Sequence, residues 1–119
     1  MKIAITAKGE GLDAQVDERF GRAQGFAIVE TETGTCEYVD NRQNVEAVQG
    51  AGTQAAQTVV GQGVETLLTG HCGPNAFRAL QAAGIKIIVG VTGTVGEVGD
   101  RFKAGELKEA DAADVGGHW

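Results

Sequence analysis

The chain has 119 residues, a hydrophobic content of 42% and a formal net charge of −6. Its length fits one domain that can bury a real core, which excludes a disordered chain. Because no cluster of Lys and Arg offsets the negative charge, general binding to a nucleic-acid backbone is not expected.

The N-terminal segment begins directly as a strand, without the pattern of a signal peptide. No apolar run is long enough to span a membrane, so no membrane partner is expected. The expected location is therefore the cytoplasm, where Cys36 and Cys72 would both be reduced thiols. A disulfide between the two cysteines is the less favoured alternative.

The first part of the chain predicts three strands joined by one long connection and one short turn. The strands are expected at residues 2–7, 25–30 and 36–40. Residues 8–22, with several glycines and polar side chains, form the long connection. The short turn between the second and third strands makes them an antiparallel hairpin.

The middle of the chain alternates helices with strands. Recurring alanines and valines predict an amphipathic helix over roughly 50–62. A second helix begins near Pro74, which suits the first turn, and ends at Gly84. Apolar runs predict strands at 64–69 and 85–91, and the second run is typical of a strand buried on both faces.

The last part of the chain predicts one more helix and a tail. Val95, Val98 and Phe102 recur at helical spacing, whereas residues 108–119 are polar and are expected to form a loosely held C-terminal tail. The domain then spans residues 1–107. The order β-β-β-α-β-α-β-α, with helical crossovers between the later strands, predicts a mixed five-stranded α/β sheet with helices packed on it.

The strongest candidate site is the loop between the fourth strand and the second helix, which consists of Gly70, His71, Cys72, Gly73, Pro74 and Asn75. A helix start offers free N–H groups and partial positive charge to an anion. The same position is expected to favour the thiolate of Cys72, and His71 and Cys72 are candidate metal ligands. The alternative is a tight turn with a buried cysteine and a partly exposed histidine.

Two further loops are predicted to lie at the same edge of the sheet, because the carboxyl ends of parallel strands meet there. The loop after the first strand contains Gly9 and Gly11, which would let a bulky ligand approach the backbone. The loop after the fifth strand contains Thr92, Gly93 and Thr94. Its hydroxyls would donate to an anion or, as the favoured alternative, cap the last helix.

A charged segment precedes the second strand. Arg19 and Arg22 would pair with a bound anion or with their acidic neighbours Asp17 and Glu18. Exposed ion pairs with those neighbours are the default interpretation. Phe20, between the two arginines, is expected in the core.

Three segments together resemble the dinitrogenase iron–molybdenum cofactor biosynthesis family, which includes NifX-like carriers and the C-terminal domain of NifB-like proteins. They are the KIAI strand, the stretch VDERFGRAQGFAIVE and the loop and helix GHCGPNAFRALQAAGIKI. The resemblance covers roughly residues 1–107. It implies a ribonuclease-H-like α/β fold with strand order 3-2-1-4-5 and an antiparallel second strand. It also implies reversible binding of metal–sulfur clusters without turnover.

The ligand implied by the resemblance is a molybdenum–copper sulfide cluster, with an iron–molybdenum or iron–sulfur precursor as the alternative. Helix N-termini and arginines would neutralise such an anion, and its own sulfides would complete the metal coordination. Implied protein partners belong to a cluster-assembly or cell-division-linked complex. Two other functions stay open: a small thiol-dependent enzyme that uses Cys72 with His71 or a distant group as base, and a phosphate or nucleotide module.

Overall fold

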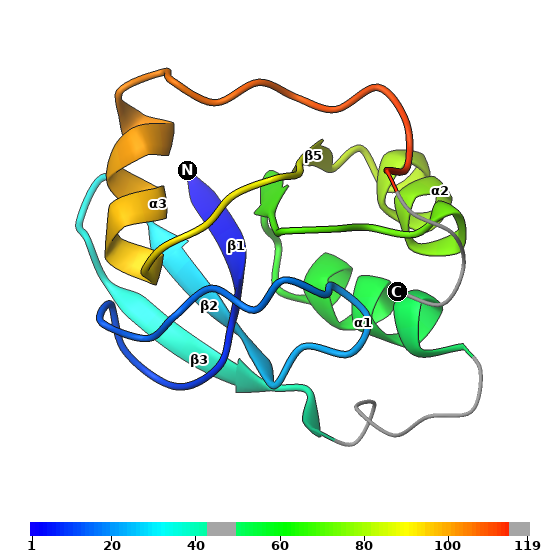
Figure 1. Cartoon of the computed structure of the whole chain (residues 1–119), viewed down its shortest axis with the longest axis horizontal. Coiled ribbons are helices and arrows are strands. Elements are labelled where there is room, and N and C mark those ends of the chain that lie inside the picture. The colour runs from blue at the N-terminus through cyan, green and yellow to red at the C-terminus, as the bar shows by residue number, and fades with distance from the viewer. Residues whose placement is uncertain (43–49, 115–119) are drawn as a thin grey trace.

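Five strands form a mixed sheet in the computed structural model, which describes residues 1–42 and 50–114 (Figure 1). In chain order, they are β1 (Lys2–Ala7), β2 (Gly25–Glu30), β3 (Cys36–Asp40), β4 (Thr66–Leu68) and β5 (Lys86–Ile88). Their order in space is β3-β2-β1-β4-β5, with β2 antiparallel to both of its neighbours and β4 parallel to both of its own. The predicted mixed α/β sheet, its strand order and its antiparallel second strand are confirmed.

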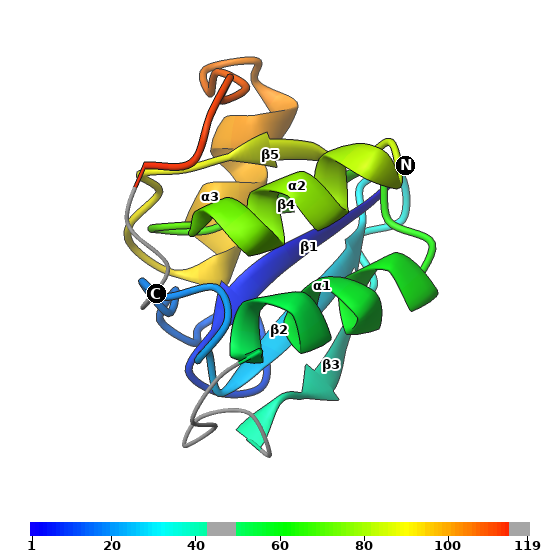
Figure 2. The same ribbon diagram turned by 90° about the vertical axis from the view of Figure 1, so that its right-hand side faces the viewer.

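The described residues contain three helices, α1 (Ala51–Gly61), α2 (Pro74–Ala82) and α3 (Val95–Lys103). The first two pack side by side on one face of the sheet, and α3 covers the other face (Figure 2). Gly84 and Gly105, at φ values of 80° and 74°, end α2 and α3 in the left-handed conformation that glycine adopts readily. Within the described ranges, none of the helices has the length and apolar character needed to cross a bilayer.

Alternate side chains of the sheet feed two separate cores, because successive residues of a strand point to opposite faces. On β1, Ala4 packs in the core beneath α1 and α2, whereas Ile3 and Ile5 pack in the core beneath α3. Val95 and Val98 supply the apolar side of α3 and are fully buried there. The central strand is therefore covered on both faces, and its two ends are the places where loops can build a site.

The strands β4 and β5 have only three residues each, fewer than the predicted ranges 64–69 and 85–91. Beyond β5 the chain turns at Gly90, whose φ is 79°. The N–H of Gly90 donates to the carbonyl of Gly70 over 2.8 Å. The apolar run thus leaves the sheet early, and its last residues join the loops at the carboxyl edge.

The tail beyond α3, where the sequence predicted a loosely held segment, contacts the domain at residues 110–114. Figure 1 shows this orange to red segment running from α3 past β5 to α2. Ala110 and Ala113 pack against the core beneath α1 and α2, and the Ala110 N–H donates to the Ile87 carbonyl over 2.7 Å. Isolated alanines make no apolar stripe, so the pattern of the sequence hides this contact. Residues 115–119 lie outside the described part of the chain.

Candidate functional site

The loops after β1, β4 and β5 meet at one edge of the sheet, as predicted. The three strands are parallel to one another, so their carboxyl ends point the same way. The N–H of Val16 donates to the carbonyl of Gly93 over 2.9 Å, and Gly90 is bonded to Gly70 as described above. Each loop is therefore tied by its backbone to a neighbouring loop.

The loop before α2 lies directly against the segment that follows β1. The His71 N–H donates to the Glu18 carbonyl over 2.7 Å, and the Phe20 N–H donates to the His71 carbonyl over 3.1 Å. A Cβ atom on Gly70 would lie 2.6 Å from the Glu18 carbonyl oxygen, so this approach requires glycine. The short parallel bridge places Arg19 beside His71.

Asp17 fixes the shape of this segment. Its buried carboxylate accepts the N–H groups of Arg19 at 3.3 Å and Gln24 at 3.1 Å, and its carbonyl accepts the Thr6 hydroxyl at 2.6 Å. Within residues 1–42 and 50–114, Arg19 forms no salt bridge. The predicted ion pair is therefore wrong for Arg19, and its charge stays available to an anion. Phe20 is fully buried, as predicted.

Asp114, on the tail, belongs to the site although the sequence did not suggest it. Its carboxylate accepts the Cys72 N–H at 2.8 Å and lies 2.7 Å from Nδ1 of His71. The Asp114 N–H also donates to the Cys72 carbonyl over 3.3 Å. A separation of 42 residues from Cys72 leaves no local motif, so the contact becomes visible only in the folded chain.

The Cys72 side chain is a neutral thiol, whereas the sequence predicted a favoured thiolate. It is fully buried. Burial, and then the negative charge of Asp114, raise the pKa of the Cys72 thiol to about 12. The helix start is too weak to offset these two effects, so the prediction of a favoured thiolate is wrong. A neutral, inaccessible thiol disfavours a nucleophile and also a direct metal ligand.

Iodoacetamide is expected to alkylate Cys36 of the native protein before Cys72. At pH 8 a thiol with this pKa is ionised in only about one molecule in 10,000, and its sulfur is shielded from the reagent. Cys36 is partly exposed, although burial raises its pKa as well. Mass spectrometry of the Cys36→Ser and Cys72→Ser variants measures the two rates separately. If Cys72 reacts as fast in the native protein as in urea, this description of the thiol is wrong.

The start of α3 is closed by its own residues. The Thr94 hydroxyl accepts the Glu97 N–H at 3.2 Å, and the Glu97 carboxylate accepts the Thr94 N–H at 3.0 Å. The favoured prediction of capping is confirmed. The bond from the Thr94 N–H holds the pKa of the Glu97 carboxyl below its usual range. Nearby, the Arg101 guanidinium donates to the Thr92 carbonyl over 2.6 Å, close to Gly93.

Arg101 was not predicted at the site. It lies two helical turns after Thr94, and helical side chains lean toward the N-terminus of their helix. That spacing was the available signal, because it brings the guanidinium back to the loop that precedes α3. The Arg101 side chain, which comes from α3, therefore places a positive charge beside the loop after β5, whose own residues there are uncharged.

The loop after β1 provides open space. A Cβ atom on Gly9 or Gly11 would meet no atom within 4 Å. A hollow of about 470 Å³ is lined by Lys8, Gly9, Glu10, Gln24, Tyr38, Asp40 and Arg42. Its walls carry both signs of charge, and Asp40 is already paired with Arg42 at 2.9 Å. The predicted role of both glycines in admitting a bulky ligand fits this space and stays a prediction.

The donor set decides what kind of ligand the site suits. In the part of the chain that the structure describes, no three His, Cys, Asp or Glu side chains gather as a metal site. The edge instead offers backbone N–H groups, arginines and close glycines. Such a set fits an anion that carries its own metal coordination better than a bare metal ion.

A family model described as dinitrogenase iron–molybdenum cofactor matches residues 1–105. The chain belongs to this family, which confirms the resemblance seen in the sequence. Comparison with curated proteins gives no significant match.

Solved structures extend the comparison. The apo form of the orange protein from Desulfovibrio gigas is 46% identical over 96% of both chains, with a TM-score of 0.93. A putative NifB protein from Thermotoga is 40% identical over 91% of both chains, with a TM-score of 0.79. A putative dinitrogenase from Methanocaldococcus jannaschii, at 17% identity over 94% of this chain and 96% of its own, shares the fold with a TM-score of 0.70.

Proposed function

We propose that this chain is a non-catalytic carrier that binds an anionic metal–sulfur cluster at the edge formed by the loops after β1, β4 and β5. Family membership and similarity to the orange protein support a cofactor-binding role. The proposed cargo is a molybdenum–copper sulfide cluster, with an iron–molybdenum or iron–sulfur precursor as the alternative. The ribonuclease-H-like description, the cytoplasmic location and partners in a cluster-assembly or cell-division-linked complex stay predictions.

The observation that carries the proposal is the way the loop before α2 holds a carboxylate. The Cys72 N–H and the His71 ring both contact the Asp114 carboxylate, at 2.8 and 2.7 Å. By the geometry of a helix start, the N–H groups of Asn75 and Ala76 have no carbonyl partner within α2. In a chain of net charge −6, these local donors and the helix dipole are what attract an anion.

Two arginines add positive charge on either side of this loop. Arg19 is bridged to His71 through the backbone, and Arg101 contacts the loop after β5. Hydrogen bonds from guanidinium groups to an anion are stronger than those from neutral donors. The neutral thiol of Cys72 supports binding without turnover, because the site then lacks an activated nucleophile.

Anaerobic incubation with tetrathiomolybdate and copper, followed by gel filtration, tests the proposal. We expect a coloured protein fraction that carries molybdenum and copper in a fixed ratio, measured by elemental analysis and visible absorption. An iron–sulfur precursor is the parallel arm and reports the alternative cargo. A colourless, metal-free protein in both arms would overturn the proposal.

An Arg19→Gln variant, matched with Lys86→Gln, separates local from overall charge. Both changes remove one positive charge. Lys86 is exposed, however, and lies at the amino end of β5, whereas the site lies at the carboxyl ends of the strands. We expect Arg19→Gln to weaken cluster uptake about fivefold and Lys86→Gln to leave it unchanged. Equal losses in the two variants would mean that net charge, rather than this edge, drives uptake.

A further inference from the structure

The two helices that begin at the site edge, α2 and α3, have their first N–H groups capped in different ways. Thr94 and Glu97 close α3 from within its own first turn. The N-cap of α2 is Gly73, which has no side chain to offer, and the first turn of α2 contains no acidic residue. The carboxylate found in front of α2 comes from Asp114, far along the chain. The cap of α3 is therefore part of the helix itself, whereas the carboxylate in front of α2 depends on the position of the tail.

The Asp114 carboxylate sits on the donors that an anionic ligand would use. Its two oxygens are divided between the Cys72 N–H and Nδ1 of His71. The side chain remains 27% exposed, and that of His71 is 38% exposed. Solvent therefore reaches both side chains, and an exposed polar contact of this kind can be broken at modest cost.

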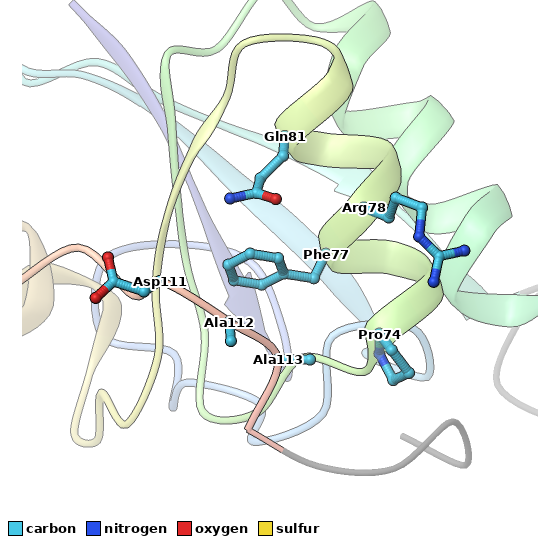
Figure 3. A pocket seen from close by; sticks show the side chains of 7 residues that line it. All are labelled: Pro74, Phe77, Arg78, Gln81, Asp111, Ala112 and Ala113. Atoms are coloured by element: carbon cyan, nitrogen blue, oxygen red, sulfur yellow. The ribbon is translucent and has the colours of Figure 1, made fainter.

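The tail that carries Asp114 is packed only thinly against α2. An open groove of about 230 Å³ separates the two, and Figure 3 shows the Phe77 ring between α2 and the tail segment with Ala112 and Ala113. Alanine methyl groups bury little apolar area, so their contribution to holding the tail is small. Two backbone bonds, from Ala110 and Asp114, complete the attachment.

We propose that Asp114 is a tethered anion that occupies the donors before α2 while cargo is absent, and that cluster loading displaces it together with the tail. This inference rests on the proposed function, since it concerns the same donors. In the empty protein, Asp114 keeps the Cys72 N–H paired and avoids the cost of an unsatisfied donor. During loading, the apparent affinity falls in proportion to the fraction of molecules with the tail in place.

Asp114→Ala, matched with Asp111→Ala, tests the inference. Asp111 is an exposed residue of the same tail, and its carboxylate accepts no hydrogen bond from any described residue. Each variant removes one negative charge, so the difference between them reports the contact and not the charge. We expect Asp114→Ala to bind the tetrathiomolybdate–copper cluster at least about fivefold more tightly than Asp111→Ala. Asp114→Asn, which keeps the shape, is expected to be intermediate.

Hydrogen exchange without cluster supplies a readout that does not depend on cargo. The Cys72 amide is expected to exchange faster in Asp114→Ala than in Asp111→Ala, because its acceptor is gone. Equal exchange, or equal or weaker cluster uptake by Asp114→Ala, overturns the inference and leaves the proposed function standing. Failure of the wild type and every variant to take up cluster overturns the proposed function and the displacement with it.

Discussion

Replacing Gly70 with alanine is expected to lower the free energy of unfolding by about 3 kcal/mol and to abolish cluster uptake. The new Cβ would lie 2.6 Å from the carbonyl oxygen and 2.7 Å from the Cα of Glu18, and these backbone atoms cannot rotate away. The hydrogen bond from the His71 N–H to the Glu18 carbonyl would have to break, which moves His71 away from its place at the site. Urea denaturation measures the stability, and the anaerobic assay measures uptake.

Gly61→Ala is the matched control for this change. Gly61 ends α1, and a Cβ atom there would meet nothing within 4 Å. The stability of this variant is expected to stay the same or rise slightly, because alanine restricts the unfolded chain and favours a helix. If both variants unfold at the same urea concentration as the wild type, the close approach at Gly70 is contradicted.

Phe20→Ala is expected to cost about 4 kcal/mol, a large share of the stability of a domain this small. The ring is fully buried, with its centroid 5.7 Å from that of Phe26. The backbone N–H of Phe20 also donates to the His71 carbonyl, at the loop before α2. Removing the ring therefore leaves a cavity in the core and loosens the wall of the site. The urea midpoint should fall sharply with little change in the slope of the transition.

Phe102→Ala makes the same chemical change at a half-buried position on α3. Its expected cost is smaller, about 1 kcal/mol, because water already reaches part of that ring. Cluster uptake should stay at the wild-type level, since Phe102 packs in the core beneath α3, on the face of the sheet opposite α2. A loss of stability equal to that of Phe20→Ala would contradict the difference in burial.

The helices could be predicted well because their signals are local. The stripe after Pro74 and the stop at Gly84 bracket α2 within two residues of its observed end. Thr94 followed by Glu97 is a capping pattern that needs no distant partner. Such signals act within one or two turns, so the sequence carries them in full.

The lengths of the last two strands could not be predicted from their apolar residues. Val91 is buried, as its type suggests, but it lies in a loop beyond β5 and not in the sheet. Apolar character reports burial, whereas strand pairing also depends on where the chain turns. Here the left-handed conformation of Gly90 turns the chain out of the sheet just after β5.

The chemistry of the site was the hardest part to predict. The sequence pointed to the loop before α2 and to the three-loop edge, because glycines, a proline and a strand end mark them. It missed Asp114, which accepts the Cys72 N–H and is, after burial, the second cause of the raised pKa of the thiol. Burial and through-space charge arise from tertiary packing, which no local pattern encodes.

The bond between Ala110 and Ile87 has a consequence for the outer side of the sheet. β5 is an edge strand, and the tail covers the Ile87 carbonyl that faces outward. Displacement of the tail would uncover this edge, and an uncovered edge strand can pair with a strand of another molecule when it is long enough. With only three residues in β5, the uncovered edge is too short to template stable self-association. The short length of β5 would therefore limit pairing with another molecule if the tail is displaced as proposed.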